Sequence, residues 1–332
     1  MRSFPLWLKT VLPVVCVVVL VGGLSYFFSE RRSQWSMVEE DLRTIGELKV
    51  EQIDAWRRER LGDAGVLMRR PELVANAVKL IEDPGDPAAT SALLRRFEDL
   101  RTHYGYADVL LVDMTGRVVL SLSGDTGRIA GSAQAAVQTA LAERRPALTD
   151  IHARDFRGPS HLSAVAPVLR ENGQDEAVGA VLLVSDAGSS LYPIIQSWPT
   201  ETRSAETLLF RREGDQVLFL NELRHQENTA LTLRVPIARE ELPAAAAARG
   251  EYGFFEDRAS RGVYTVALAL PVPGSLWSVV AKIDAAEAFA PWRFRSVMIL
   301  VLLFGMLALL IALSLYVWQR RQATHYHELY ET

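Results

Sequence analysis

Two long apolar runs without a charged residue lie near the two ends of this 332-residue chain, at residues 11–28 and 297–318. A helix rises about 1.5 Å per residue, so either run with a few flanking residues crosses a hydrocarbon core of about 30 Å. The first run is longer than a usual secretory signal, and no small-residue cleavage site follows it. Both runs are therefore expected to span the plasma membrane, with the short termini in the cytoplasm and residues 31–295 outside it.

The segment between the runs contains no cysteine, because the single cysteine, Cys16, lies in the first run. Packing alone must therefore stabilise the outer segment, which is compatible with an oxidising compartment. The formal net charge of −4 shows no excess of the positive charge that nucleic-acid binding requires. We expect a lipid bilayer as a partner and no nucleic acid.

The outer segment begins with helical patterns. Residues 33–67 carry apolar side chains three or four positions apart, which predicts an amphipathic stalk helix on the order of 50 Å long. A break at Gly46 or Gly62 is the alternative, although one glycine costs only about 1 kcal/mol within a helix. Residues 71–82 and 87–103 predict two further helices, each beginning at a proline.

The pattern then changes to strands. Residues 107–113 and 118–122 predict a hairpin of buried strands, with Gly116 at the positive-φ position of its turn. A glycine-bearing loop, a helix with Ser132 at its N-cap, three strands and a short helix follow, at residues 124–131, 132–144, 148–154, 161–169, 178–186 and 190–198.

A smaller copy of this pattern follows in the second half of the chain. Leu208, Leu209 and Phe210 align with Leu110, Leu111 and Val112, and each group precedes a glycine turn and a second strand. Two strand-turn-strand units in register indicate an internal repeat. The expected architecture is α+β, with two modules along one stalk, each an antiparallel sheet with helices on one face.

The order of elements resembles the double Cache sensor domains of bacterial transmembrane receptors, which consist of tandem PAS-like sheets. The segments LLVDMTGRVVLSL, HARDFRG and GAVLLVSD carry the resemblance, which extends over residues 31–295. It implies a small-molecule ligand in the membrane-distal module, between the sheet and a lid helix. The tail RRQATHYHELYET resembles the lead into a cytoplasmic signalling module, often followed by a histidine kinase or a diguanylate cyclase.

The expected division of the chain follows from this resemblance and from the apolar runs. The parts are a cytoplasmic N-terminus, a first transmembrane helix, a stalk helix, a membrane-distal ligand-binding module, a membrane-proximal module, a juxtamembrane helix, a second transmembrane helix and a cytoplasmic tail, at residues 1–10, 11–30, 31–70, 71–198, 199–284, 285–295, 296–318 and 319–332.

The resemblance also implies where a ligand binds. Amino-acid-binding members carry an arginine, a tryptophan and a tyrosine near the lid helix, a tyrosine and an aspartate on the next strand, and an aspartate ending a later strand. Asp186 matches the last position, and the lid segment RIAGSAQAAVQT contains Arg128 but neither aromatic residue. This departure argues against an amino-acid ligand.

Alternation along the predicted strand 148–154 places Asp150, His152 and Arg154 on one face. Histidine and arginine side chains there suit a carboxylate or a phosphate-like anion, because a guanidinium offers a planar pair of donors. A solvated sheet face is the alternative for each residue taken singly. The candidate ligand-binding residues are Arg128, His152, Arg154, Asp155, Arg157, His161, Asp186 and Tyr106.

Catalytic and metal-binding motifs are not expected. The sequence has no HExxH, GxSxG or phosphate-loop pattern, and His152 and His161 lack a zinc-ligand spacing. We therefore expect no cofactor, no metal and no enzymatic activity in these residues. The leading hypothesis is the sensory input part of a receptor that acts as a homodimer, and the alternative is a membrane-anchored scaffold that binds protein.

Overall fold

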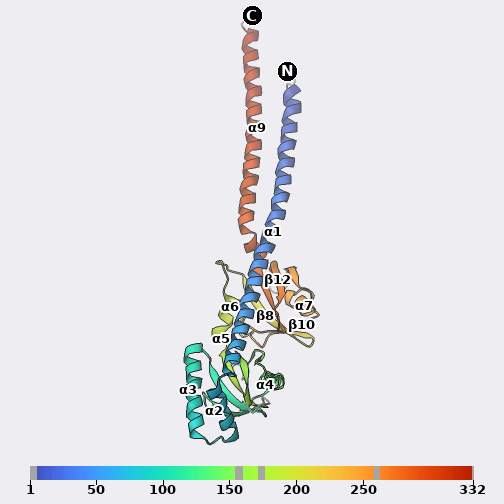
Figure 1. Ribbon diagram of the computed structural model, residues 1–332. Helices are drawn as coiled ribbons and strands as arrows, with labels where there is room; N and C mark the ends of the chain where they lie inside the picture. The colour runs from blue at the N-terminus through green and yellow to red at the C-terminus, as the bar shows by residue number, and fades with distance from the viewer. Residues whose placement is uncertain (1–5, 154–159, 171–175, 258–261, 331–332) are drawn as a thin grey trace. The chain divides into compact units, whose positions relative to one another are not determined.

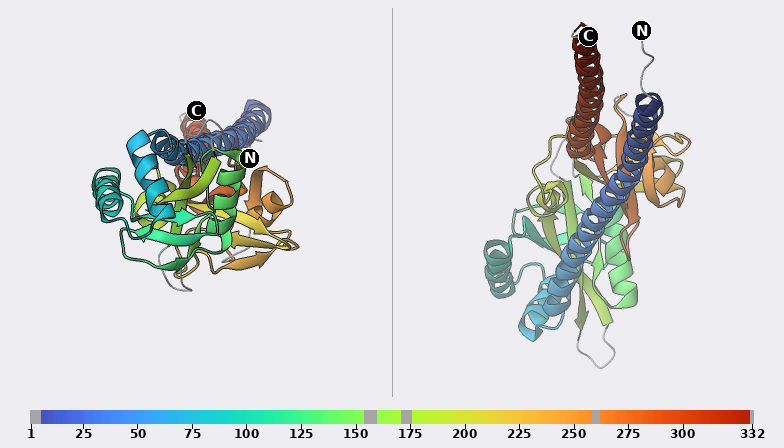
Figure 2. Two further views of the ribbon diagram at one scale, coloured as in Figure 1. Left: turned by 60° about the horizontal axis from the view of Figure 1, so that its bottom comes forward. Right: turned by 90° about the horizontal axis from the view of Figure 1, so that it is seen from above.

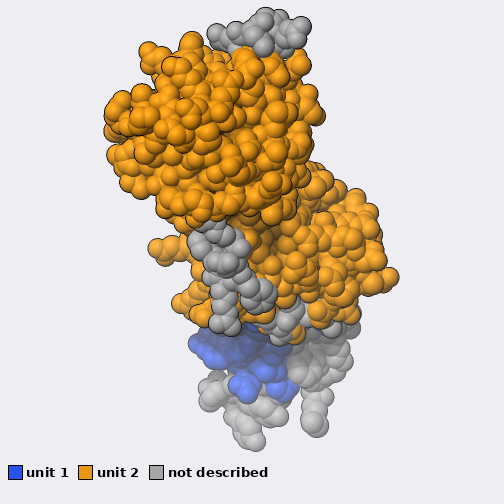
Figure 3. All heavy atoms as spheres, turned by 90° about the horizontal axis from the view of Figure 1, so that it is seen from below, with its two compact units in different colours: residues 1–42, 283–332 blue, residues 43–282 orange. Residues whose placement is uncertain are grey.

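The structure, a computed structural model, describes residues 6–153, 160–170, 176–257 and 262–330. Its chain contacts divide it into two compact units, residues 1–42 with 283–332 and residues 43–282 (Figure 3). The first unit contains the apolar helices, and the second contains both sheets.

Two helices of the first unit are long and apolar enough to cross a membrane, judged by length and composition. They are α1 (Leu6–Leu67), which begins in this unit, and α9 (Ala290–Tyr330), which follows the short helix α8 (Ala285–Ala288) (Figure 1). The rings of Trp35 and Phe289 lie 4.5 Å apart between their centroids. A Cβ atom on Gly23 would lie 2.7 Å from Leu303, so a glycine lets α1 and α9 approach closely there.

Helix α1 is unbroken through Gly46 and Gly62, as the single-stalk prediction requires. Gly46 has a packing role, because a Cβ atom there would lie 3.0 Å from Leu268 and 3.2 Å from Leu270. A glycine therefore lets the helix backbone lie against strand β12 (Thr265–Pro271).

The first sheet has the strand order β3-β2-β1-β7-β6-β4, with β5 paired to β6 and every strand pair antiparallel. Its strands are β1 (Asp108–Asp113), β2 (Arg117–Ser121), β3 (Gly127–Arg128), β4 (Ala147–Leu148), β5 (His152–Ala153), β6 (Ser160–Arg170) and β7 (Glu176–Asp186). Three helices accompany it: α2 (Pro71–Glu82), α3 (Pro87–Tyr104) and α4 (Gly131–Glu143).

The second sheet repeats this arrangement in the order β10-β9-β8-β13-β12-β11. Its other strands are β8 (Glu206–Glu213), β9 (Gln216–Phe219), β10 (Arg234–Pro236), β11 (Gly253–Asp257) and β13 (Trp277–Asp284). Helices α5 (Ala187–Ser190) and α6 (Tyr192–Gln196) precede it, and α7 (Pro243–Ala248) lies against it. The shared order agrees with the predicted internal repeat.

The prediction of helices on one face is wrong for the first sheet. Side chains alternate along β1, so Val109 and Leu111 pack with α2 and α3, whereas Leu110 and Val112 pack with α4. Figures 1 and 2 show α2 and α3 on one side of the sheet and α4 on the other. Both faces are covered because four consecutive strand residues are apolar and each face must be buried.

Three local predictions also differ from the structure. The strand expected at residues 148–154 is divided into β4 and β5, with residues 149–151 between them. Helix α4 begins at Gly131 and has no side-chain cap, so Ser132 does not cap it. The helix expected at residues 190–198 is replaced by α5 and α6, with Asp186 capping the first of them.

An apolar core joins the two sheets within the second unit. It contains Ile53 and Trp56 from α1, Ile151 and Leu162 from the first half, and Leu209, Leu220 and Trp277 from the second sheet. The hydroxyl of Tyr192, whose pKa burial raises to about 12, donates a hydrogen bond to the carbonyl oxygen of Leu220. The two sheets and the stalk helix therefore share this apolar core.

Candidate functional site

A cavity of about 740 Å³ lies at one end of the first sheet. Its walls are the beginnings of β1 and β6, the end of β7, β5, residues 123–131 and the first turn of α4. The volume is in the range of about 300–1,000 Å³ that holds small molecules in proteins. We call it the first cavity.

Three of the predicted ligand-binding residues line the first cavity: Arg128, His152 and His161. His152 and His161 are direct partners across the β5–β6 pair, so both side chains lie on one face. Arg128 comes from β3, opposite Arg117 of β2, which pairs with Asp113 at 3.3 Å. No ion pair links Arg128 to another residue in the described ranges.

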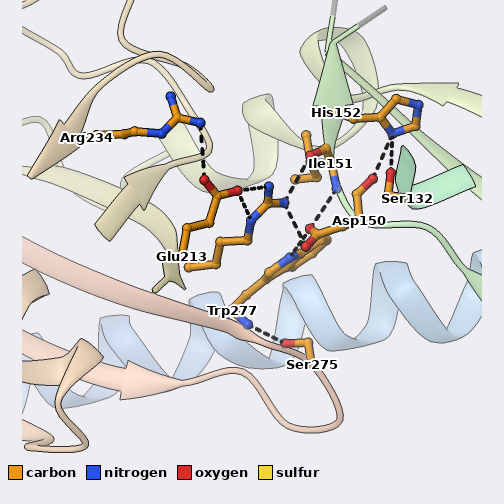
Figure 4. A network of polar contacts seen from close by, with 9 residues as sticks. Ser132, Asp150, Ile151, His152, Glu213, Arg234, Ser275 and Trp277 are labelled. Atoms are coloured by element: carbon orange, nitrogen blue, oxygen red, sulfur yellow. Dashed lines mark hydrogen bonds and ion pairs between the residues drawn. The ribbon is translucent and has the colours of Figure 1, made fainter. Parts of the chain in front are cut away.

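One backbone contact and one side-chain contact hold the ring of His152. Its Nδ1 lies 2.9 Å from the carbonyl oxygen of Asp150 and 3.2 Å from Oγ of Ser132 (Figure 4). A carbonyl oxygen only accepts hydrogen bonds, so Nδ1 carries a proton and donates a hydrogen bond to the backbone carbonyl oxygen of Asp150. The other ring nitrogen, Nε2, makes no hydrogen bond to another described residue.

The structure places two other predicted residues outside the lining. Asp186 accepts a hydrogen bond from the backbone N–H of Gly188 at 2.8 Å and thereby caps α5. Tyr106 is buried against α1, where its hydroxyl donates to Asp63 and Arg60 lies 5.0 Å from its ring. Burial, followed by the hydrogen bond to Asp63, raises the pKa of the Tyr106 hydroxyl.

Arg154, Asp155 and Arg157 lie outside the described residues. The strand alternation proposed for Asp150, His152 and Arg154 fails at its first member, because Asp150 lies between β4 and β5. Its carboxylate contacts the second sheet, whereas His152 lines the first cavity.

Several lining residues were not anticipated, among them Asp108, Ser123, Asp125, Thr126, Ser132 and Ser163. Four of them belong to the stretch SGDTGRIAGS, in which glycines, hydroxyls and acids follow the hairpin. That composition predicted a loop, and its concentration of short polar side chains beside Arg128 was the available signal for a binding wall.

Asp108 stabilises the wall of the first cavity. One carboxylate oxygen accepts from the N–H groups of Val109 at 2.8 Å and Ser123 at 3.1 Å. The other accepts from the hydroxyls of Ser121 at 3.2 Å and Ser123 at 2.5 Å. With four protein donors the carboxylate has little capacity left for a ligand, so Asp108 positions residues 121–123.

A polar network connects the segment beside His152 to the second sheet (Figure 4). The carboxylate of Asp150 accepts from Nε1 of Trp277 at 2.8 Å and pairs with Arg211 at 2.7 Å. Arg211 also pairs with Glu213, which pairs with Arg234 at 3.2 Å. Burial lowers the pKa of Arg211, but the hydrogen bond that Arg211 donates to Glu213 and the charge of Asp150 outweigh it and raise that pKa. We call these residues the Asp150 network.

The stalk helix joins this network through Arg57. Its guanidinium lies 5.4 Å from the ring centroid of Trp277 and donates to the carbonyl oxygens of Pro273 at 2.8 Å and Gly274 at 2.6 Å. The segment that carries Asp150 therefore contacts Trp277 of β13, and Trp277 in turn contacts Arg57 of α1.

Within the described ranges no group of three or more histidine, cysteine, aspartate or glutamate side chains is arranged to hold a metal ion. The first cavity is lined by Arg128, two histidines and several hydroxyls, together with the carboxylates of Asp108 and Asp125. A guanidinium with hydroxyls beside it can bind an anionic group of a small molecule.

Comparisons with known proteins identify the fold. No protein-family model matches the chain, and no curated protein matches it. Among solved structures, the ligand-binding domain of the Pseudomonas fluorescens chemoreceptor CtaA with L-leucine aligns at TM-score 0.52 and 14% identity, covering 76% of this chain and 97% of that one. The ligand-binding domain of Mlp24 with asparagine aligns at TM-score 0.52 and 17% identity, covering 79% and 98%.

The ligand-binding domain of the Pseudomonas aeruginosa PAO1 amino acid chemoreceptor PctB with L-Arg aligns at TM-score 0.50 and 18% identity, covering 76% and 97%. The described chain therefore has the fold of the ligand-binding domains of bacterial chemoreceptors, which are sensor domains of the double Cache type.

Proposed function

We propose that this chain is the sensory input part of a bacterial transmembrane receptor and that it binds a small molecule in the first cavity. The observation that carries the proposal is the group of Arg128, His152 and His161 around a cavity of about 740 Å³ in a chemoreceptor-type fold. The two long apolar helices support a membrane location, with residues 31–295 outside the cytoplasm.

The ligand class follows from which lining groups remain available. Arg128 has no ion-pair partner within the described ranges, and Nε2 of His152 is the ring nitrogen not used by Asp150. Of the two lining carboxylates, Asp108 already accepts four hydrogen bonds and offers little to an ammonium group, and Asp125 also interacts within the protein. We infer that the ligand carries a carboxylate or a phosphate-like anion, with the lining hydroxyls as further partners.

An amino acid is one member of this class, because the structural neighbours contain L-leucine, L-Arg and asparagine. Apart from the two histidines, none of the described lining residues is aromatic. An organic acid without an amino group therefore fits the first cavity at least as well.

The signal path begins at the Asp150 network. A ligand that binds His152 favours one position of the segment at residues 150–153, and Asp150 transfers that bias to Trp277 and Arg211. The bias then reaches the second apolar helix and a cytoplasmic kinase or cyclase module, with two copies of the chain acting together. The coupling is limited by the difference in ligand affinity between the two states.

A thermal-shift screen of the full chain in lipid nanodiscs tests the site. Organic acids, amino acids and phosphorylated metabolites are compared with the neutral amide of each acid. One anion should give saturable stabilisation, about 2.7 kcal/mol at a hundred times its Kd, and its neutral amide should not.

Arg128→Gln should abolish this stabilisation. Arg145→Gln provides the matched control, because Arg145 is an exposed arginine paired with Glu143 outside the first cavity. Equal stabilisation of both variants would exclude Arg128 from the site, and no response across the screen would favour the protein-binding scaffold.

A further inference from the structure

A second cavity of about 650 Å³ lies in the second half of the folded unit. It is lined by residues 196–202, the beginning of β8 and residues 222–224 after β9. None of its lining residues belongs to the first cavity. We call it the second cavity.

The internal repeat relates the two cavities. With Leu208 aligned to Leu110, Glu206 takes the place of Asp108, and both residues line their respective cavities. By the same alignment, residues 222–224 take the place of 124–126, which include lining residues of the first cavity. Equivalent ends of the two sheets therefore form a hollow in both copies.

The wall of the second cavity is held together by buried polar contacts. Glu206 is 8% exposed, and one of its carboxylate oxygens lies 2.8 Å from Nζ of Lys282. The other accepts from the backbone N–H of Arg224 at 2.9 Å. The Arg224 guanidinium donates to the carbonyl oxygens of Ala205 at 2.5 Å and Thr202 at 2.9 Å, so its donors hold the wall.

Other lining groups remain available to a ligand. Glu201 is exposed and makes no ion pair within the described ranges, and Glu222 uses only one carboxylate oxygen, to accept from Thr229. Trp198, half-buried, lines the same cavity. The hydroxyl of Thr207 is buried, in a residue 3% exposed, and has no hydrogen-bond partner in the described part of the chain.

We propose that the second cavity is a separate binding site for a small organic cation such as an amine. Lys282 neutralises the charge of Glu206. The remaining charges of the lining are the two carboxylates of Glu201 and Glu222 and the single guanidinium of Arg224, so negative charge is in excess. An ammonium group pairs with these carboxylates and lies over the indole of Trp198, which attracts cations through its ring. The unpartnered hydroxyl of Thr207 accepts from a further N–H group.

This inference goes beyond the anion site of the first sheet and stands without it. The two halves of the repeat differ in charge: the first cavity is lined by Arg128 and two histidines with Asp108 and Asp125, and the second by Glu201, Glu206 and Glu222 with Arg224. One chain then senses two classes of molecule.

The test is isothermal titration of the full chain in lipid nanodiscs. The probes are 1,4-diaminobutane, ethanolamine and choline, and 1,4-butanediol is the neutral match of the diamine. At least one amine should bind saturably while the diol does not. Absence of binding by all three amines, or equal binding of diol and diamine, would overturn the proposal.

Variants then locate the site. Glu201→Gln and Trp198→Leu should each weaken amine binding by about fivefold or more. Glu227→Gln, an exposed glutamate outside the lining, should leave it unchanged, and so should His152→Gln in the first cavity. Loss of amine binding in His152→Gln with retention in Glu201→Gln would place the amine in the first cavity and refute the second site.

Thermal unfolding midpoints of the variants show whether a loss of amine binding is caused by unfolding. Glu201 is exposed and its replacement removes no described contact, so Glu201→Gln should unfold at the wild-type temperature. Full amine affinity in a folded Glu201→Gln and a folded Trp198→Leu would overturn the assignment. Anion binding in the first cavity is measured on the same variants, so failure of one site is distinguishable from failure of the other.

Discussion

Replacement of Asp150 by asparagine tests whether the two sheets are joined as the contacts indicate. One carboxylate oxygen of Asp150 accepts from the N–H of Ile151 and from Nε1 of Trp277, both at 2.8 Å. The other lies 2.7 Å from the guanidinium of Arg211. An asparagine keeps the first acceptor, but it turns an amide N–H group toward a guanidinium that also only donates.

The magnitude follows from burial. The side chains of Arg211 and Asp150 are 16% and 24% exposed, so solvent screens this pair less than a surface pair. A hydrogen bond to a charged group contributes about 1.5–3 kcal/mol. We expect Asp150→Asn to lower the free energy of unfolding by about 2 kcal/mol, which lowers the unfolding midpoint by about 4–8 °C for a unit of this size.

Thermal unfolding of the full chain in detergent, followed by tryptophan fluorescence, measures this change. Arg211→Gln and the double variant complete a double-mutant cycle, whose coupling energy should exceed about 0.5 kcal/mol. Glu98→Gln is the control, because the pair of Glu98 and Arg101 is about half exposed and should contribute little. Additive effects of Asp150→Asn and Arg211→Gln would refute the proposed link between the sheets.

Further predictions concern packing and pH. Gly179→Ala should destabilise the fold by about 1–3 kcal/mol in urea unfolding, because its Cβ would lie 2.3 Å from the carbonyl oxygen of Val112. Gly62→Ala, within α1 and with open space around it, should instead stabilise by up to about 1 kcal/mol, and a loss there would contradict the packing. Partial burial raises the pKa of Glu213, but the hydrogen bond and charge of Arg211 outweigh it and lower that pKa below 4.5. The folded pKa is the lower one, so this stabilisation is present above about pH 4.5 and is lost as the pH falls further. The thermal unfolding midpoint should therefore fall less steeply below about pH 4.5 in Glu213→Gln than in the wild type. An unchanged slope would count against the ion pair.

The hairpin, the helices and the repeat were accessible from the sequence because each depends on local pattern. Residues 110–112 and 208–210 precede glycine turns, and both strands occur in the structure. The prediction that helices lie on only one face of the first sheet was wrong, although the sequence carried the signal. The unbroken apolar run of β1 requires that other elements pack on both faces of the sheet.

The candidate site was only partly accessible. Strand alternation singled out His152, and the resemblance singled out Arg128 in the lid segment; both residues line the first cavity together with His161. Asp150 was predicted on the wrong face because its partners, Arg211 and Trp277, are distant in sequence. No local pattern shows that the strand is interrupted at Asp150 so that its carboxylate contacts them. Asp108 was missed because a single aspartate before an apolar strand gives no sign of its four donors.

The hydrogen bonds of Asp108 also bear on how selective the first cavity is. The protein supplies all four donors to this carboxylate, so the segment at residues 121–123 is fixed by the chain itself. A preorganised wall costs a ligand little ordering entropy, and it adapts little to a ligand of the wrong length. Homologous acids that differ by one methylene should therefore differ in affinity mainly through fit, with association rates that stay nearly constant along the series.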